Sequence, residues 1–158
     1  MLKTSNNIMN RKKILILFCF FVLINNLHAQ ILTPVKWSYG AKKTNEKETV
    51  VFFKATIDDD WHIYSTNQMD GGPVKTSITF FRSNEYAIVG KLVEPQPVIK
   101  YEPNFKMDVH YFEKSVVFQQ KIRVNKKGFV LKGKLNFMVC NDQKCLPPED
   151  VTFAIPIN

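Results

Sequence analysis

The sequence has few of the features that mark a metal site, a membrane protein or a helical domain. Its 158 residues include three cysteines and three histidines, and none of these stands at a recognised metal-ligand spacing. Beyond residue 30, no apolar run reaches the roughly 20 residues that span a bilayer. The sequence contains no internal repeat, low-complexity segment, linker or long amphipathic helix. These absences predict one small domain that is built mainly from strands.

The first thirty residues have the order of a secretory signal peptide. Three basic residues, Arg11–Lys13, precede the apolar run Ile14–Ile24, and a polar break then leads to the small residue Ala29. The run has about half the length of a membrane span, so we expect cleavage after Ala29 and no stable membrane anchor afterwards. Cys19 lies inside the run and would be removed, which leaves two cysteines. The predicted organisation is a signal peptide at 1–29 and one domain at 30–158, exported to an oxidising compartment, which the resemblance described below identifies as the periplasm.

The charge balance argues against nucleic acid as a partner. The formal net charge is +8, from 22 basic and 14 acidic residues. Four basic residues precede Ala29, so the predicted mature chain has 18 basic against 14 acidic residues and a net charge of +4. The lysines are scattered along alternating segments, as on the solvated face of a sheet. We therefore expect no nucleic-acid binding.

Short segments rich in Val, Ile, Phe and Tyr recur along the chain, with turn residues about every ten positions. Strands of this size need a second sheet to cover their apolar face. The predicted fold class is therefore all-β, an immunoglobulin-like two-sheet β-sandwich. Eight or nine strands are expected, at Val35–Tyr39, Thr49–Ile57, Trp61–Ser65, Ser77–Arg82, Ala87–Val93, Val98–Tyr101, Tyr111–Val124, Phe129–Cys140 and Val151–Ile157.

Two cysteines near the C-terminus are separated by four residues, Asn141–Lys144. Four residues are a common hairpin connection, which would place Cys140 and Cys145 opposite each other. Cross-strand Cα separations of roughly 4.5 to 5.5 Å fall within the range of disulfides. In an exported protein the bond should form.

The residues alone leave three roles open for this bond. A loop of six residues contributes only about 2 kcal/mol of chain entropy, against roughly 4 to 5 kcal/mol for a long loop, so the bond is a weak structural staple. The polar residues Asn141–Lys144 favour access for a partner's thiolate and thus thiol–disulfide exchange. A third possibility is a soft-metal site, in which two thiolates would be assisted by residues drawn from Met69, Met107, Met138, His62 and His110.

Several segments together resemble the N-terminal periplasmic domain of the thiol:disulfide interchange protein DsbD. The resemblance rests on their order and spacing and covers most of the predicted mature chain. The segments are Trp61-His62-Ile63-Tyr64-Ser65, Gly72-Pro73, Phe105–Phe112 leading into Val116–Phe118, and Cys140-x4-Cys145-x-Pro147-Pro148.

The resemblance implies a redox function on an immunoglobulin-like sandwich. Its two cysteines would cycle between dithiol and disulfide without a cofactor. The domain would take electrons from a membrane-embedded thiol reductase and pass them to thioredoxin-like periplasmic proteins. As an enzyme it would be a thiol–disulfide oxidoreductase that acts as a stoichiometric electron carrier.

Individual residues acquire roles from the same resemblance. Cys140 and Cys145 would be the redox pair, with Cys145 the more accessible sulfur that forms the mixed disulfide. Phe105 would be the cap phenylalanine that shields the bond, and His62 and Tyr64 would line the site. The remaining assignments are Trp61, interpreted as a core residue, and Asp108, which could act electrostatically near the pair.

The sequence departs from better-known members of the family in three respects. It has one residue fewer between the cysteines, and its cap reads Phe105-Lys106-Met107 where they have Phe-Tyr-Gly. It also ends at Asn158, so we expect a stand-alone carrier that docks with a separately encoded reductase. The alternative is a non-catalytic exported binding module in which the disulfide only staples the hairpin.

Overall fold

Alternating buried and exposed side chains along the longer strands show that each sheet buries one face. In β8 (Ser115–Val124) and β9 (Phe129–Phe137) almost every second residue is buried. The computed structural model describes residues 32–103 and 105–158, so the predicted signal peptide, its cleavage site and Cys19 lie outside the described residues. The other strands in the described part are β1 (Val35–Lys43), β2 (Glu48–Ile57), β3 (His62–Tyr64), β4 (Ser77–Phe80), β5 (Tyr86–Val93), β6 (Val98–Glu102), β7 (Met107–Glu113), β10 (Val139–Cys140) and β11 (Glu149–Ile157).

Two antiparallel sheets form the main layers of the domain. One has the strand order β1-β2-β8-β5 and the other has the order β11-β9-β4. Their apolar faces meet in an aromatic core, where the rings of Phe53 and Phe153 lie 4.8 Å apart between centroids and Trp37 contacts both Phe118 and Phe137. The predicted all-β, immunoglobulin-like sandwich is confirmed, and the described residues contain no helix long and apolar enough to cross a bilayer.

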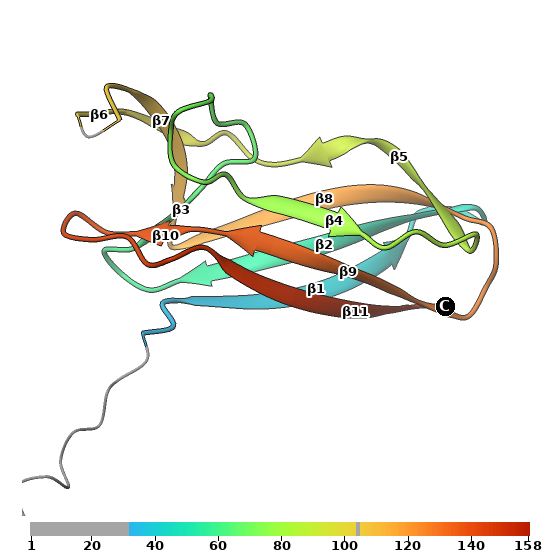
Figure 1. Ribbon diagram of the computed structural model, residues 1–158. Helices are drawn as coiled ribbons and strands as arrows, with labels where there is room; N and C mark the ends of the chain where they lie inside the picture. Colours follow the sequence, from blue (N-terminus) through green and yellow to red (C-terminus); the bar gives the residue numbers. More distant parts are fainter. Residues whose placement is uncertain (1–31, 104) are drawn as a thin grey trace, which may run out of the picture. The chain divides into compact units, whose positions relative to one another are not determined.

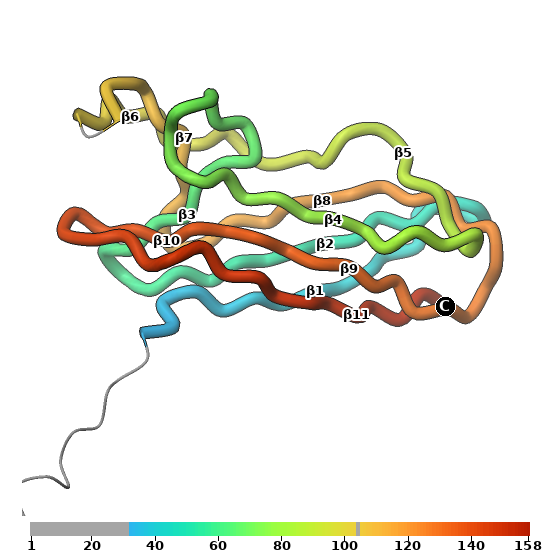
Figure 2. Tube along the Cα trace, in the orientation of Figure 1, coloured from blue at the N-terminus to red at the C-terminus, as the bar shows by residue number. Residues whose placement is uncertain are grey.

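A third sheet lies at one end of these layers and was not predicted. Its strand order is β10-β3-β7-β6, and Figure 1 shows these four short strands together at one end of the longer ones. The path of the chain in Figure 2 shows β9 running on into β10. The main sandwich therefore supports the small sheet through continuous backbone.

Two predicted strands are each divided in the structure. The segment Tyr111–Val124 is not one strand, because Lys114, with a φ of 60°, separates β7 from β8. A positive φ is rare for a residue with a side chain and turns the chain sharply. Phe129–Cys140 is likewise interrupted at Met138. At Lys114 the chain passes from the small sheet to a main sheet, and at Met138 it passes from a main sheet to the small sheet.

The ends of the other strands differ less from the prediction. β1 continues past the predicted end at Tyr39 to Lys43, where it pairs with Thr49. β7 begins at Met107, because pairing with β6 extends it beyond the predicted start at Tyr111. The described part of the chain thus has eleven strands in place of the eight or nine predicted.

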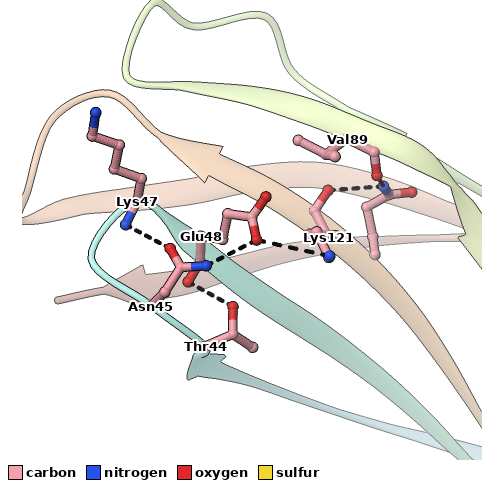
Figure 3. A network of polar contacts seen from close by, with 7 residues as sticks. Thr44, Asn45, Lys47, Glu48, Val89 and Lys121 are labelled. Carbon is pink, nitrogen blue, oxygen red and sulfur yellow. Dashed lines mark hydrogen bonds and ion pairs between the residues drawn. The ribbon is translucent and has the colours of Figure 1, made fainter.

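The turn between β1 and β2 is held by a polar network (Figure 3). The side chain of Asn45 accepts a hydrogen bond from the backbone of Lys47 and donates one of 3.0 Å to the carboxylate of Glu48. Lys121 of β8 lies 3.8 Å from the same carboxylate, and the Thr44 hydroxyl donates to the Glu48 carbonyl. These contacts favour one register of β1, β2 and β8.

Gly133 of β9 gives the first testable prediction, because a Cβ there would lie 2.3 Å from the Phe153 ring and 2.3 Å from the Thr79 carbonyl oxygen. The Thr79 carbonyl belongs to the backbone of the paired strand and cannot move without disturbing the sheet. Gly133→Ala should therefore lower the free energy of unfolding by about 1 to 3 kcal/mol, measured by urea denaturation. Gly40→Ala is the matched control, since no atom lies within 4 Å of its Cβ position. Equal stability of the two variants would contradict this account of the packing.

Candidate functional site

The turn between the two cysteines is closed by its own first residue. The side-chain oxygen of Asn141 accepts hydrogen bonds from the backbone amides of Gln143 (3.0 Å) and Lys144 (2.8 Å), as asparagine commonly does in turns. The backbone amide of Asn141 donates a hydrogen bond of 2.9 Å to the backbone carbonyl of Lys144. The predicted hairpin is therefore present, and it forms an antiparallel bridge between Cys140 and Cys145.

Cys140 and Cys145 form a disulfide bond, with an S–S distance of 2.04 Å. Their Cα atoms are 4.0 Å apart, slightly closer than the predicted 4.5 to 5.5 Å. Cys140 is only 2% exposed, whereas Cys145 is an exposed residue. A partner can therefore reach one sulfur of the bond much more easily than the other.

His62 and Tyr64 lie beside the bond because β3 pairs with β10. The register places Cys140 opposite His62. His62 Nε2 and the Tyr64 hydroxyl oxygen lie 3.2 Å apart. Tyr64 is 3% exposed and packs in a small apolar cluster with Val109, Met138 and Cys140. Both residues are thus next to the disulfide, as the resemblance implies.

Phe105 lies in the turn between β6 and β7. Its backbone amide donates a hydrogen bond of 3.1 Å to the Glu102 carbonyl, and the next residue, Lys106, has a φ of 56°. The Phe105 side chain is half-buried against the cluster that contains Cys140. The residue that the resemblance suggests as a cap therefore lies against the cluster that contains one of the two cysteines.

A second loop supports this turn. Met107, two residues after Phe105, packs so closely on Gly72 that a Cβ there would lie 2.9 Å from the methionine sulfur. Gln68 exchanges hydrogen bonds with both backbone groups of His110 on β7. A side chain at Gly72 would therefore require the flexible Met107 side chain to move.

The disulfide, Phe105 and the β3 residues His62 and Tyr64 line one cleft, with a volume of about 130 Å³. Its charged groups are three acids and one base, and they come from β6, β7 and the turn. The lining residues are His62, Tyr64, Lys100, Glu102, Phe105, Val109, Tyr111, Glu113, Cys140, Asn141, Asp142 and Cys145.

The environment of the cleft shifts the pKa of two lining residues in opposite directions. Burial lowers the pKa of His62 below its ordinary value of 6.5, although the charges of Glu113 and Asp142 act to raise it. Burial, followed by the charge of Glu102, raises the pKa of Tyr64 to about 12. In the neutral range the imidazole is therefore mostly uncharged and the phenol keeps its proton.

Five residues singled out from the sequence, Cys140, Cys145, Phe105, His62 and Tyr64, meet in this cleft. Asp108 does not line it: the residue is exposed and pairs with Tyr101 on β6. Trp61 is half-buried against the main core.

The residues considered for a soft metal differ in their position relative to the disulfide: His62 lines the cleft with both cysteines, whereas His110 does not. Met138 is buried beside Cys140, Met107 packs at the edge of the same cluster, and Met69 is exposed. Among the described residues, no group of three His, Cys, Asp or Glu side chains is placed to hold a metal ion.

Glu113, Lys100, Glu102 and Tyr111 also line the cleft, and sequence reasoning did not assign them to the site. Alternation could have grouped Tyr111 with Glu113, since they are two residues apart on β7 and face the same side, but it does not show which strand lies beside them.

The fold and site together define an immunoglobulin-like domain with a solvent-accessible hairpin disulfide. Residues 29–156 match the family described as thiol:disulfide interchange protein DsbD, N-terminal. The chain belongs to this family. Membership and the Cys140–Cys145 disulfide together support thiol–disulfide exchange as its chemistry.

Solved structures have the same fold at low sequence identity. The reduced DsbD N-terminal domain of Neisseria meningitidis is 17% identical, with a TM-score of 0.53, over 77% of this chain and 85% of that one. The N-terminal periplasmic domain of ScsB from Proteus mirabilis is 18% identical, with a TM-score of 0.57, over 80% of this chain and 49% of that one.

A further similar structure is a complex between the DsbD and PilB N-terminal domains of Neisseria meningitidis. Its match is 17% identical, with a TM-score of 0.51, over 82% of this chain and 88% of that one. No curated protein matched the chain significantly.

Proposed function

We propose that this domain is a periplasmic electron carrier that cycles the Cys140–Cys145 pair between dithiol and disulfide. It receives two electrons from a membrane-embedded thiol reductase and passes them to thioredoxin-like proteins. The observation that carries the proposal is the asymmetry of the disulfide, in which Cys145 is exposed at a cleft and Cys140 is buried behind it. A disulfide that closes a loop of only six residues contributes little stability, about 2 kcal/mol. The exposure of Cys145 to a partner therefore says more about the function of the bond than its stabilising effect does.

The transfer takes place in two steps. The Cys145 thiolate attacks one sulfur of a partner's disulfide, which forms a mixed disulfide and releases the partner's other thiolate. Cys140 then attacks Cys145 Sγ, which closes the Cys140–Cys145 bond and releases the partner's second thiolate. The domain loses two electrons and two protons overall, and the partner's disulfide is reduced to a dithiol.

Relatives support the proposed compartment and partners. One similar structure is a periplasmic domain, and another is a DsbD N-terminal domain in complex with a second protein domain. We accordingly assign residues 1–29 as the export signal, cut after Ala29, and residues 30–158 as the exchange domain.

The mass of the protein recovered from the periplasm tests the assigned boundary. The expected mass is that of a chain beginning at Gln30, because signal peptidase cuts after a small residue. A chain that retains Met1 would contradict the assignment.

Single-cysteine variants test the exchange reaction itself. Reduced Cys140→Ser should accumulate a mixed disulfide with a thioredoxin-like protein that keeps a single active-site cysteine, activated as its mixed disulfide with 5-thio-2-nitrobenzoate. The exposed Cys145 displaces the nitrobenzoate thiol, and neither protein has a second cysteine that could resolve the product. Reduced Cys145→Ser should trap at least about 10-fold less, since its remaining sulfur is buried. Non-reducing electrophoresis and intact mass give the yields. Equal trapping by both variants would refute the assigned roles, and no trapping by either would favour a binding module with a structural disulfide.

Phe105→Ala tests the proposed shield. Removing the ring uncovers the buried side of the disulfide, so reduction by a small thiol such as dithiothreitol should become several-fold faster. Phe81→Ala serves as the control, because Phe81 is a 51% exposed phenylalanine that does not line the cleft. If both variants are reduced at the wild-type rate, Phe105 does not shield the bond.

A further inference from the structure

Three adjacent strands of the small sheet place a cysteine, a histidine and a glutamate in one row. The register pairs Cys140 of β10 with His62 of β3, and His62 in turn with Glu113 of β7. Directly paired residues of an antiparallel sheet have their Cβ atoms about 4.5 to 5.5 Å apart and project from the same face. The three side chains are therefore consecutive neighbours on one surface.

The surface that carries these three side chains is the one that faces the cleft. Cys140, His62 and Glu113 all line it, although they come from three separate strands. His62 is further held by the Tyr64 hydroxyl at 3.2 Å and by the ring of Tyr111, whose centroid is 4.8 Å away. The imidazole thus has a defined position between the buried cysteine and the carboxylate.

The second step of exchange needs a proton acceptor at this position. The attacking form of a cysteine is the thiolate, and Cys140 is 2% exposed, so bulk water has poor access to its thiol. The ammonium of Lys100 has no lone pair with which to accept a proton. The Tyr64 phenol keeps its own proton in the neutral range, and carboxylates are weaker bases than imidazole.

Resting on the exchange function proposed above, we propose that His62 accepts the proton of the Cys140 thiol when Cys140 resolves the mixed disulfide, and that Glu113 stabilises the imidazolium formed. Cysteine–histidine pairs oriented by a third group activate nucleophiles in this way. Here His62 is the proton acceptor and Glu113 is a positioning residue that acts through it.

The step is balanced as follows. The proton moves from Cys140 Sγ to the imidazole of His62, and the thiolate attacks Cys145 Sγ. The Cys140–Cys145 bond forms, the bond from Cys145 to the partner sulfur breaks, and the electron pair leaves with the partner's thiolate. The imidazolium then returns its proton to solvent or to that thiolate.

Several charged and titratable groups face His62 and set the pH at which it can act. The charged imidazolium form of His62 is favoured by the negative charges of Glu113, Asp142 and Glu102. It is disfavoured by burial and by the positive charge of Lys100. Among the described residues, the charged and titratable groups that line the cleft with His62 are Tyr64 on β3, Tyr111 and Glu113 on β7, Lys100 and Glu102 on β6, Asp142 in the turn after β10, and the two cysteines when reduced.

The test separates the two steps with the small disulfide 5,5′-dithiobis(2-nitrobenzoate). Reduced protein is mixed with an equimolar amount, and release of the coloured thiol is followed. The first release is bimolecular and reports attack by Cys145. The second is unimolecular and reports closure by Cys140, and its rate is measured between about pH 5 and pH 8.

In the wild type, the closure rate should rise with pH and level off, with an inflection below 6.5 because the pKa of His62 is lowered. In His62→Gln, closure near neutral pH should fall about 100-fold and the inflection should vanish, while the first release is unchanged. His110→Gln is the matched control: His110 lies on the neighbouring strand β7 but does not line the cleft, so this variant should keep the wild-type profile.

Glu113→Gln provides a second test that does not depend on removing the imidazole. Loss of the carboxylate removes an interaction that raises the pKa of His62, so the inflection should move to lower pH and the plateau should fall several-fold. A purely structural role would lower the rate without moving the inflection.

The outcomes distinguish this inference from the proposed function. Wild-type closure and a wild-type profile in His62→Gln would overturn the role of His62 and leave exchange intact. Failure of the wild-type protein to complete the two releases would overturn both. If His62→Gln unfolds, judged by circular dichroism, an unmoved inflection in folded Glu113→Gln would still refute the proposal.

Discussion

The pairing of the two-residue strand β10 with β3 is the contact on which the whole site depends. It places Cys140 next to His62 and directs the Cys140 side chain toward the cleft. A shift of one residue would turn the Cys140 side chain to the opposite face, because side chains alternate along a strand. The break at Met138 makes this pairing possible, since it releases the chain from β9 and lets β10 join the small sheet.

The rest of the domain gives that short pairing a rigid base. An aromatic core between the main sheets includes Phe53, Phe118 and Phe153 and is separate from the apolar cluster around Cys140. The packing that stabilises the sandwich is thus separate from the residues that surround the disulfide. The division into a stable sandwich and a smaller reactive end is typical of proteins whose functional groups lie near loops on a rigid scaffold.

Much of the fold could be predicted from the sequence, because alternation and turn residues are local signals. Glu48–Ile57 differs from its predicted strand by one residue, and the antiparallel bridge between the cysteines follows from a four-residue connection. The small sheet could not be predicted in this way. Its strands are short, and the apolar pattern gives no sign of the sharp turn at Lys114 that separates β7 from β8.

The site was predictable to the extent that it depended on the resemblance and on nearby residues. Cys140, Cys145, Phe105, His62 and Tyr64 were all expected, and the structure places them around one cleft. Glu113 was not expected, because only the register between β3 and β7 brings it next to His62. Asp108 was considered for its charge, yet its strand directs it away from the cleft lining.

The central claim is that the Cys140–Cys145 bond is an exchangeable one, and its reduction potential tests this most directly. The mature protein would be equilibrated with graded thiol buffers, and its free thiols would be trapped and counted by mass. A potential near about −200 mV, in the range of exchange proteins, is the predicted result. A potential below about −300 mV would describe a resistant structural disulfide and would contradict the account.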